Sequence, residues 1–570
     1  MTSFTSLPTT LSSLQGKRIV VTAYDLEQSE HRGIAVYTKS LIHCLRKAGS
    51  EVWLLTEYGE PLRDAGLRSL PKATKSYIFG ARVLDSLAHG IQSSDNHLNW
   101  IERRVGFARK ISTRYRALAI AIELARRPRY YRRHKIYQIP VENLFDNPYI
   151  RNERLSYLKD VTGLLCVRNV FLSTMLASRL KRQRPVRIDL KGFDALLTSC
   201  PLNIKPLNSS VFVQTVHDLI PLEYVQHNED PLMFSHRLQA CIPAKRIYVS
   251  TSTSIKFHNQ IQNQAKVATT NKSQQLKSIE RVVVQPPSLR FPSWLSEDHE
   301  SASDLKPISN LFSAEKDNDT DKLEELSEYK RMKVLKEKQK LRAAQKEGLS
   351  AYKKEKLLQK KKKILITDKK NRLSSNEYEQ KGLRPFQYFL FNSSVESRKN
   401  LLFLAKSYAE SNLGSQGIRL CVTGKLKGDD YSNAIEEIVK HEPSILLTGY
   451  IDESTKLDLY LNAMALLSPS LVEGFGIPVL DAACLGMTAI ASDCDSHREI
   501  YAMYDFEQYV LPISTHKSLE WATAMKAVAG NSIDLCNQPY KERKRRISRY
   551  EAKYKIICKQ FQKDLEDLLC

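Results

Sequence analysis

The chain has 570 residues, of which 42% are apolar, and a formal net charge of +24. The apolar fraction is typical of a globular protein and excludes a chain dominated by disorder. No apolar run reaches the roughly 18 to 20 residues that span a bilayer. The excess of positive charge favours polyanionic partners, namely nucleic acid, an anionic membrane surface or substrates that carry phosphate.

The beginning of the chain and its cysteines indicate a compartment. The first residues lack the basic and apolar segments of a secretory signal, and the ten cysteines are scattered singly. Scattered cysteines favour neither a zinc site nor a disulfide framework and suit a reducing environment. We therefore expect a cytoplasmic protein.

The first half, residues 1–295, alternates short apolar strands with helices. The runs that read as strands are KRIVVTAY, SEVWLLT, FDALLTSCP, VFVQTVHDLIPL, RIYVSTS and RVVVQPP, and RGIAVYTKSLIHCLRKAG reads as an amphipathic helix. This order predicts a doubly wound, mostly parallel sheet. Residues 102–135 are basic with apolar residues between, so they form either a membrane-surface segment or an ordinary helix with a basic solvent face.

Residues 296–383 differ from both flanking halves. They are rich in Lys, Glu, Asp, Ser and Asn, and residues 321–370 hold 18 Lys or Arg against 8 Asp or Glu. The composition predicts a solvated, partly helical or disordered insertion. The alternative is a segment that contacts phosphates or anionic lipid.

The second half, residues 384–570, opens at PFQYFLFNSS and again alternates strands with helices. It predicts a second doubly wound sheet.

Within it, residues 468–486 read SPSLVEGFGIPVLDAACLG. Glu473 and the glycines Gly474 and Gly476 follow a strand, where open α/β sheets bind ligands. The glycines allow the backbone to approach a ligand, and the helix that follows presents its N-terminus to phosphate. Asp481, inside that helix, could bind vicinal hydroxyls. The alternative is a glycine turn before a buried helix.

This stretch resembles the donor-binding signature of the retaining glycosyltransferases of family 4, which have the GT-B fold. The resemblance implies two Rossmann-like domains that face each other across a cleft, with the last helix returning to the first domain. In the family the first acidic residue, here Glu473, contacts the transferred sugar, and the second, here Asp481 in place of the usual Glu, holds the ribose.

Other stretches resemble the family in the same order along the chain. SSVESRKN implies that Lys399 and Arg398 lie near the donor diphosphate, although Ser393 and Ser397 stand where the family has Arg and Pro. The resemblance implies further donor-site residues at Gly33, at Gly424 and Lys425, at Gly449, Tyr450 and Ile451, and at Gly474, Phe475 and Gly476. VQTVHDLIPL implies that His217 lies beside the transferred sugar.

The resemblance implies a retaining, metal-independent hexosyltransferase with His217, Glu473 and Lys399 as catalytic residues and no cofactor. GDP-mannose is the favoured donor and UDP-glucose the runner-up. The acceptor would be a glycan or lipid-linked saccharide in surface polysaccharide assembly, such as that of lipopolysaccharide. The protein would be peripheral on the inner face of the cell membrane.

Two alternatives belong to other classes. Asp481 and Ser393 would suit a GT-B scaffold that has lost catalysis, and the net charge would suit a nucleic-acid-binding protein. No zinc-finger, RNA-recognition or helix-turn-helix signature supports the second alternative.

Overall fold

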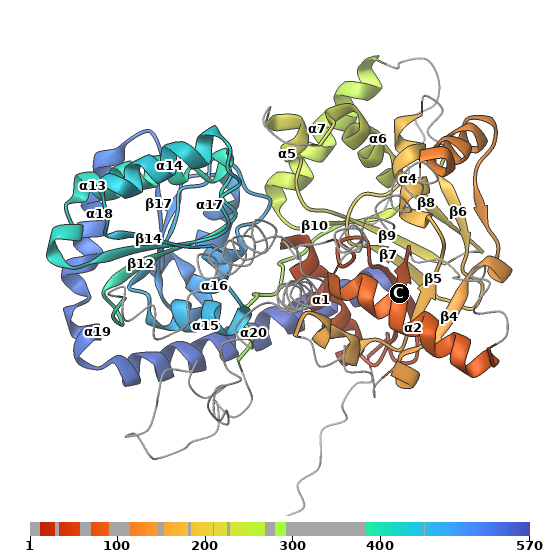
Figure 1. Cartoon of the computed structure of the whole chain (residues 1–570), viewed down its shortest axis with the longest axis horizontal. Helices are drawn as coiled ribbons and strands as arrows, with labels where there is room; N and C mark the ends of the chain where they lie inside the picture. Colours follow the sequence, from red (N-terminus) through yellow and green to blue (C-terminus); the bar gives the residue numbers. More distant parts are fainter. Residues whose placement is uncertain are drawn as a thin grey trace, which may run out of the picture. The chain divides into compact units, whose positions relative to one another are not determined.

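The structure of the chain is a computed structural model (Figure 1). It describes residues 12–28, 33–57, 70–89, 114–144, 153–180, 184–208, 210–224, 229–267, 280–291, 383–449 and 451–570. The chain divides into two compact units. The first unit comprises Met1–Ser288 and Tyr554–Cys570, and the second comprises Leu289–Lys553.

The first unit is built on an eight-stranded sheet of order β11-β10-β9-β7-β1-β2-β5-β4. The strands are β1 (Arg18–Thr22), β2 (Glu51–Thr56), β4 (Tyr137–Pro140), β5 (Gly163–Cys166), β7 (Ala195–Thr198), β9 (Val211–Val216), β10 (Lys245–Tyr248) and β11 (Glu280–Val282). Neighbouring strands are parallel except for β4, which pairs with β5 in the antiparallel sense at one edge. A separate parallel sheet, β3-β6-β8, consists of β3 (Tyr130–Tyr131), β6 (Val186–Asp189) and β8 (Ile204–Leu207).

Apolar side chains of the large sheet are buried on both faces. In β1, Ile19 and Val21 belong to one core cluster and Val20 to another, as expected because successive side chains of a strand point to opposite faces. The helices are α1 (Gly33–Lys47), α2 (Lys72–His89), α4 (Val170–Arg179), α5 (Ile220–Glu223), α6 (Pro231–Cys241), α7 (Thr251–Val267) and a helix over 114–126. Short 3-10 helices are η3 (Arg133–Lys135), η4 (Val141–Leu144) and η6 (Glu153–Asp160).

The second unit has a six-stranded, wholly parallel sheet of order β14-β13-β12-β15-β16-β17. Its strands are β12 (Tyr388–Asn392), β13 (Arg419–Thr423), β14 (Ile445–Gly449), β15 (Ala465–Ser468), β16 (Thr488–Ser492) and β17 (Val510–Ile513). Its helices are α13 (Leu401–Ser411), α14 (Asp430–His441), α15 (Glu453–Asn462), α16 (Ile477–Leu485), α17 (Asp495–Tyr501), α18 (Ser518–Asn531), α19 (Ile533–Asn537) and α20 (Pro539–Leu569), with 3-10 helices η8 (Ser397–Lys399), η9 (Gly414–Gln416) and η10 (Phe506–Gln508).

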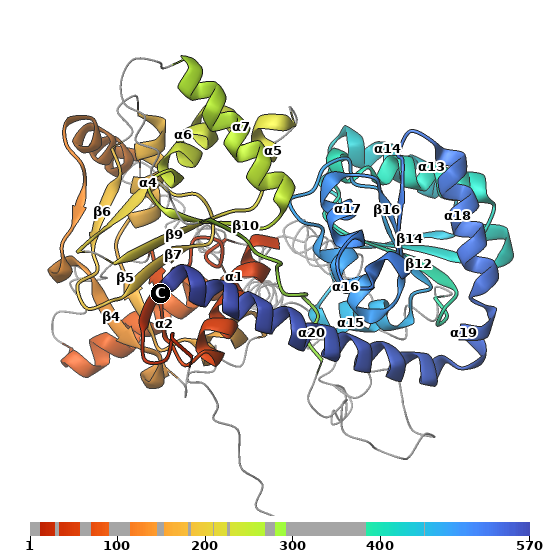
Figure 2. The ribbon, with the colours of Figure 1, turned by 180° about the vertical axis from the view of Figure 1, so that it is seen from behind.

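Helices cover both faces of the second sheet. In both views α13 and α14 lie on one face and α15 and α16 on the other (Figures 1 and 2). Helix α20 is anchored in this unit by Arg546, which is 1% exposed. Its guanidinium pairs with Glu542 at 2.9 Å and donates to the carbonyls of Tyr460, Leu461 and Ala463. The remainder of α20, from Tyr554, belongs to the first unit.

The structure confirms the predicted fold class, an α/β protein with two Rossmann-like parallel sheets. The strand-like runs of both halves contain strands, and the first two residues of RVVVQPP belong to β11, the last strand of the first sheet in chain order. Almost all of the predicted charged insertion falls within residues 292–382, outside the described residues, as do residues 102–113 of the basic segment. In the described part of the chain no helix is long and apolar enough to cross a membrane.

Candidate functional site

The second sheet has one place where its strand order reverses. The chain passes from β12 outward to β13 and β14 and then continues on the other side of β12 with β15. In open α/β sheets ligands bind at such a switch point, outside the carboxyl ends of the two strands that flank it. The segments that leave β12 and β15 are therefore the first places to look for a site.

The two segments bring predicted residues together. Arg398 and Lys399 lie in η8, after β12, and Glu473 lies in the loop after β15. The backbone N–H of Leu471 donates to the carbonyl oxygen of Arg398 at 2.8 Å, which ties the two loops to each other. Asn400, with φ of 56°, ends η8 and begins α13 in the left-handed conformation that asparagine tolerates.

Glu473 is the centre of this cluster. Its Oε1 forms an ion pair with Lys399 Nζ and accepts a hydrogen bond of 2.7 Å from Ser470 Oγ. Its Oε2 lies 3.7 Å from Arg398 Nη1. The side chains of Glu473, Lys399 and Arg398 are only 10%, 9% and 18% exposed. A carboxylate thus sits between two cations with little access to water.

Burial and charge act in opposite directions on Glu473. Burial alone would raise the pKa of this carboxyl, but the cations Lys399 and Arg398, with His497, lower its pKa to about 2. Glu473 is therefore ionised at neutral pH. It can accept hydrogen bonds from hydroxyl groups, and it cannot act as a proton donor.

The sequence analysis missed the residues that hold this loop. Ser496 Oγ donates to the carbonyl oxygen of Glu473 at 2.8 Å. His497 is completely buried, and its Nδ1 lies 3.0 Å from both Oγ and O of Ser492. Gly476 has φ of 99°, and a Cβ there would come within 2.9 Å of His497 Cδ2. Ser496 and His497 follow β16, so the rule that located Glu473 could have indicated them.

The glycines of the loop lead directly into α16. Gly474 and Phe475 precede Gly476, the N-cap of the helix, and Phe475 is buried. Asp481 lies inside α16, as predicted, and is 1% exposed. Its Oδ1 is 3.1 Å from the hydroxyl of Tyr550 in α20. The carboxylate proposed for ribose is therefore engaged with a second helix.

Two other predicted positions meet at the ends of β13 and β14. The N–H of Gly424 donates to the carbonyl oxygen of Gly449 at 2.9 Å. Gly424 has φ of 120°, and a Cβ there would lie 2.2 Å from the carbonyl oxygen of Ser393. Lys425 is exposed and Ile451 half-buried, while Tyr450 lies outside the described residues. Glycine at 424 is thus required by the close approach of the segment after β12.

The remaining predicted residues lie in the first unit. Gly33 is exposed at the start of α1, and residues 29–32 before it are outside the described residues. His217 follows β9 and is 8% exposed. Its Nε2–H donates to the carbonyl oxygen of Ser199 at 2.8 Å, and its ring lies edge-on to Tyr37. Burial lowers the pKa of His217 to about 4, so the imidazole is neutral at neutral pH.

The first sheet also reverses its order, between β1 and β7, and polar residues that the sequence analysis missed lie there. Ser199, directly after β7, donates its hydroxyl to Oδ2 of Asp25 at 2.5 Å. Burial raises the pKa of Asp25 to about 6, opposed in part by the Ser199 hydroxyl and by Arg237. Arg237 itself pairs with Glu229. Asp25 directly follows the predicted strand run KRIVVTAY, which was the available signal.

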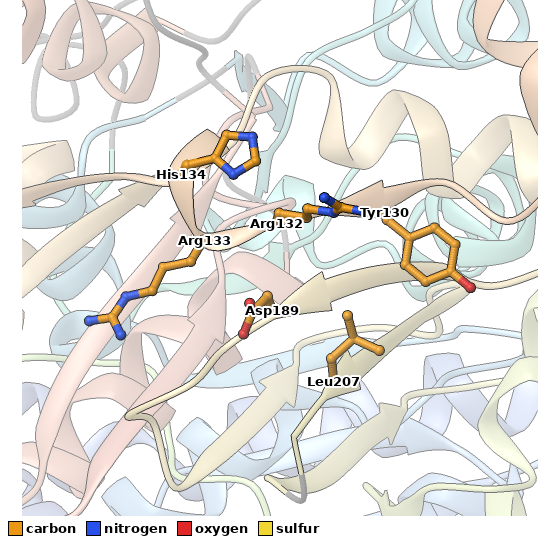
Figure 3. Close-up of a pocket in the computed structure, with 6 residues that line it drawn as sticks. All are labelled: Tyr130, Arg132, Arg133, His134, Asp189 and Leu207. Carbon is orange, nitrogen blue, oxygen red and sulfur yellow. The ribbon is translucent and has the colours of Figure 1, made fainter.

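A cavity of about 720 Å³ lies elsewhere in the first unit (Figure 3). It is lined by Tyr130, Arg132, Arg133, His134, Asp189 and Leu207. None of the predicted site residues lines it. Among the described residues, no group of three or more His, Cys, Asp or Glu side chains is arranged to hold a metal ion.

Comparisons with solved structures give distant similarities. Sucrose-phosphate synthase from Thermosynechococcus elongatus is 12% identical with a TM-score of 0.42, covering 97% of this chain and 99% of that one. Anabaena Alr3699/HepE in complex with UDP is 10% identical with a TM-score of 0.41, at 97% and 99% coverage. The α,α-trehalose 6-phosphate synthase from Burkholderia multivorans is 9% identical with a TM-score of 0.42, at 97% and 98% coverage. Because these TM-scores are below 0.5, the fold assignment rests on the sheet topology.

No curated protein matches the chain. A family model, that of the glycosyl transferases group 1, matches residues 375–554. The matched range contains every strand of the second sheet and the cluster of Glu473, Lys399 and Arg398. The second sheet and its switch-point cluster therefore lie in the part of the chain that is similar to the glycosyl transferases group 1 family.

Proposed function

We propose that the chain is a retaining glycosyltransferase that moves a sugar from a nucleoside diphosphate sugar to a hydroxyl group of a glycan or lipid-linked acceptor. The observation that supports this most directly is the buried group of Glu473, Lys399 and Arg398 at the switch point of a group 1 domain. The reaction needs cations at the diphosphate and an anionic acceptor of hydrogen bonds at the sugar, and this group supplies both.

Lys399 and Arg398 are the candidate ligands of the diphosphate. Negative charge grows on the diphosphate as the bond to the sugar breaks, and cations fixed in a water-poor site stabilise that charge. Both cations pair with Glu473, and Arg398 also pairs with Glu396 at 3.0 Å, so Lys399 and Arg398 are already held in position. Their placement therefore costs little reorganisation when the donor binds.

Glu473, ionised at neutral pH, would accept hydrogen bonds from hydroxyls of the transferred sugar. In a retaining transfer of this kind, a diphosphate oxygen takes the proton of the acceptor hydroxyl on the same face of the sugar. In the first unit, neutral His217 and the Asp25–Ser199 pair are the candidate groups for hydroxyls of sugar and acceptor. Asp481 is the candidate for ribose and would exchange its contact with Tyr550 for the ribose.

A nucleotide screen tests the proposal. Thermal shifts of the full chain are measured with GDP, UDP, ADP and their sugar conjugates, with and without a chelator. A ligand at about 100 times its Kd stabilises the folded state by about 2.7 kcal/mol. We expect one base to be selected, with GDP-mannose first and UDP-glucose second in order of testing, and no effect of the chelator.

Transfer to acceptors completes the test. The donor selected by the screen is incubated with glycan and lipid-linked acceptors, and the anomeric configuration of the product is read by NMR. Retention is expected. Absence of any nucleotide shift in folded protein would instead favour a scaffold that has lost catalysis, in line with Ser393 and the engaged Asp481.

A further inference from the structure

The helix over 114–126 has an unusual outward face. Its inner side chains Ile120 and Leu124 are 3% and 1% exposed and pack in a core cluster of the first unit. On the opposite side, Tyr115, Leu118 and Ile122 are 71%, 56% and 47% exposed. These three are spaced three and four residues apart, so they form one stripe along the helix.

The solvent-facing side of a surface helix is ordinarily polar or charged. Here even the smaller residues of the stripe are apolar, since Ala119 and Ala125 are exposed as well. The helix is therefore apolar towards the core and apolar towards the outside. A continuous exposed apolar strip of this kind marks an interaction surface rather than ordinary scatter of single residues.

Positively charged residues lie at both ends of this stripe. Residues 114–129 contain five arginines and one glutamate. The glutamate, Glu123, is paired with Arg129 at 2.6 Å. Arg114 precedes the stripe, and Arg126 and Arg127 end it, all three exposed. Exposed apolar area and neighbouring cations are the two contributions that bind a helix to the interface of an anionic bilayer.

The cavity of Figure 3 continues the positive surface. Arg132, Arg133, His134 and Lys135, in and around η3, are all exposed, and the first three line the cavity. The acidic residue of the cavity, Asp189, accepts a hydrogen bond from Asn208 Nδ2 at 2.5 Å. The cavity therefore offers cations on a short, exposed turn.

Two contacts connect the cavity side to the helix. The guanidinium of Arg184, just before β6, donates to the carbonyl oxygen of Arg126, and the N–H of Arg187 donates to that of Arg129 at 2.8 Å. Arg187 also donates to the hydroxyl of Tyr130, which is 41% exposed and lines the cavity. Helix end and cavity thus belong to one patch of surface.

We propose that the outward face of helix 114–126, together with the basic turn 132–135, is a docking surface for an anionic lipid bilayer. Tyr115, Leu118 and Ile122 enter the headgroup boundary, and the arginines pair with lipid phosphates. Nucleic acid would leave the apolar stripe without a partner. A symmetric contact with a second copy would set the same arginines against each other. The proposal does not rest on the proposed function.

Vesicle sedimentation of the full chain tests this surface. The probes are vesicles of phosphatidylcholine alone and of an equimolar mixture with phosphatidylglycerol. Wild type is expected to sediment with the mixed vesicles only. The double variant Leu118→Glu, Ile122→Glu is expected to bind them at least about tenfold more weakly. Its matched control is Leu232→Glu, Leu519→Glu, which changes two leucines that are 64% and 74% exposed elsewhere and carries the same added charge.

Equal binding by the double variant and its control would overturn the proposal, and so would equal binding of wild type to both kinds of vesicle. A second measurement covers the case in which the double variant does not fold. In Tyr115→Trp, the indole emission should shift to shorter wavelength when mixed vesicles are added, compared with wild type. No shift would show that the stripe meets no lipid, as expected if it is covered by this chain or by a protein partner.

The nucleotide-induced thermal shift of the same variants separates the two proposals. A double variant that keeps this shift and loses vesicle binding has lost the docking surface alone. A chain that binds vesicles and shows no shift with any nucleotide supports the docking surface and contradicts the proposed function.

Discussion

The two sheets of this protein carry different polar groups at corresponding edges. At the switch point of the second sheet, Glu473 is buried between Lys399 and Arg398, and its pKa falls to about 2. At that of the first sheet, Asp25 is half-buried beside a hydroxyl, and its pKa rises to about 6. Burial acts in the same direction on both carboxyls, and the neighbouring cations decide the outcome. The difference suits a charged substrate group at the second edge and hydroxyl groups at the first.

The largest effect is expected from breaking the ion pair at Glu473. Lys399→Ala removes the closest cation from Glu473 and leaves Arg398, His497 and the Ser470 hydroxyl near it. We expect transfer to fall by about 10² to 10³, as when one electrostatic group of a transition state is removed. The free energy of unfolding should fall by about 3 kcal/mol because a buried charge loses its partner. Initial transfer rates and urea unfolding measure the two effects.

The matched control for this pair is Lys427→Ala. Lys427 pairs with Glu396 at 3.1 Å, and its side chain is 36% exposed. A partner so near to water contributes little, so both transfer and unfolding should change only slightly. Equal losses in the two variants would show that the burial of the pair at Glu473 has no special role.

Asp25 and His217 are predicted to change the free energy of unfolding with pH in opposite directions. The pKa of Asp25 in the folded protein, about 6, lies above its ordinary value. The contribution of Asp25 to the free energy of unfolding is therefore complete at low pH and is lost as the pH rises through about 6. Relative to Asp25→Asn, wild type should lose on the order of 2–3 kcal/mol between about pH 4 and about pH 8. Urea unfolding at the two pH values measures this. A difference that stays constant would contradict the assigned burial.

His217 should behave in the other sense. Its folded pKa of about 4 lies below its ordinary value, so its stabilisation is present above the unfolded pKa and is lost as the pH falls through about 4. Relative to His217→Gln, wild type should therefore lose about 2–3 kcal/mol as the pH is lowered from about 7 to about 4. The same unfolding series, read as the difference between the two proteins, provides the measurement.

An effect of similar size, which does not depend on pH, is expected where the loop of Glu473 turns into α16. Gly476→Ala adds a Cβ within 2.9 Å of His497 Cδ2 at a residue with φ of 99°, and should cost about 2–3 kcal/mol. Gly428→Ala is the control, because Gly428 has φ of 73° and nothing within 4 Å of the added Cβ. It should cost about 1 kcal/mol for the backbone conformation alone. Thermal unfolding measures the loss of stability in the two variants. Equal losses would mean that the His497 side chain moves away from the added Cβ without cost.

The smallest effect is expected at Tyr550. Its hydroxyl accepts from the N–H of Leu289 at 2.7 Å and can donate to Asp481 or to the carbonyl of Leu289. Tyr550→Phe should lower the free energy of unfolding by about 1 kcal/mol. If Asp481 exchanges this contact for ribose, nucleotide affinity should be unchanged or higher in the variant, and calorimetry measures it. Weaker binding would show that Tyr550 holds Asp481 in its working position.

The alternation of apolar strands and helices was sufficient to predict both Rossmann-like sheets, because each element has its own period of apolar residues. It missed the small sheet β3-β6-β8, the antiparallel edge strand β4 and the strands β5 and β17. Most of these strands mix charged or polar residues or proline with their apolar residues, whereas the equally short β7, which was predicted, is apolar up to its last residue. Glu473 and Lys399 could be named in advance because both follow strands and because both lie in stretches that resemble motifs of the family 4 glycosyltransferases.

By itself, the sequence determined the succession of elements, the charged stretches and the residues that end each strand. Only the tertiary structure decided which of those strand ends meet. Lys399 and Glu473 are 74 residues apart, and Asp25 and Ser199 are 174 apart. They come together because parallel crossovers place β12 beside β15 and β1 beside β7, an order that no local pattern contains. Likewise helix 114–126 is apolar on two sides in its sequence, and packing alone selects the side that covers the core.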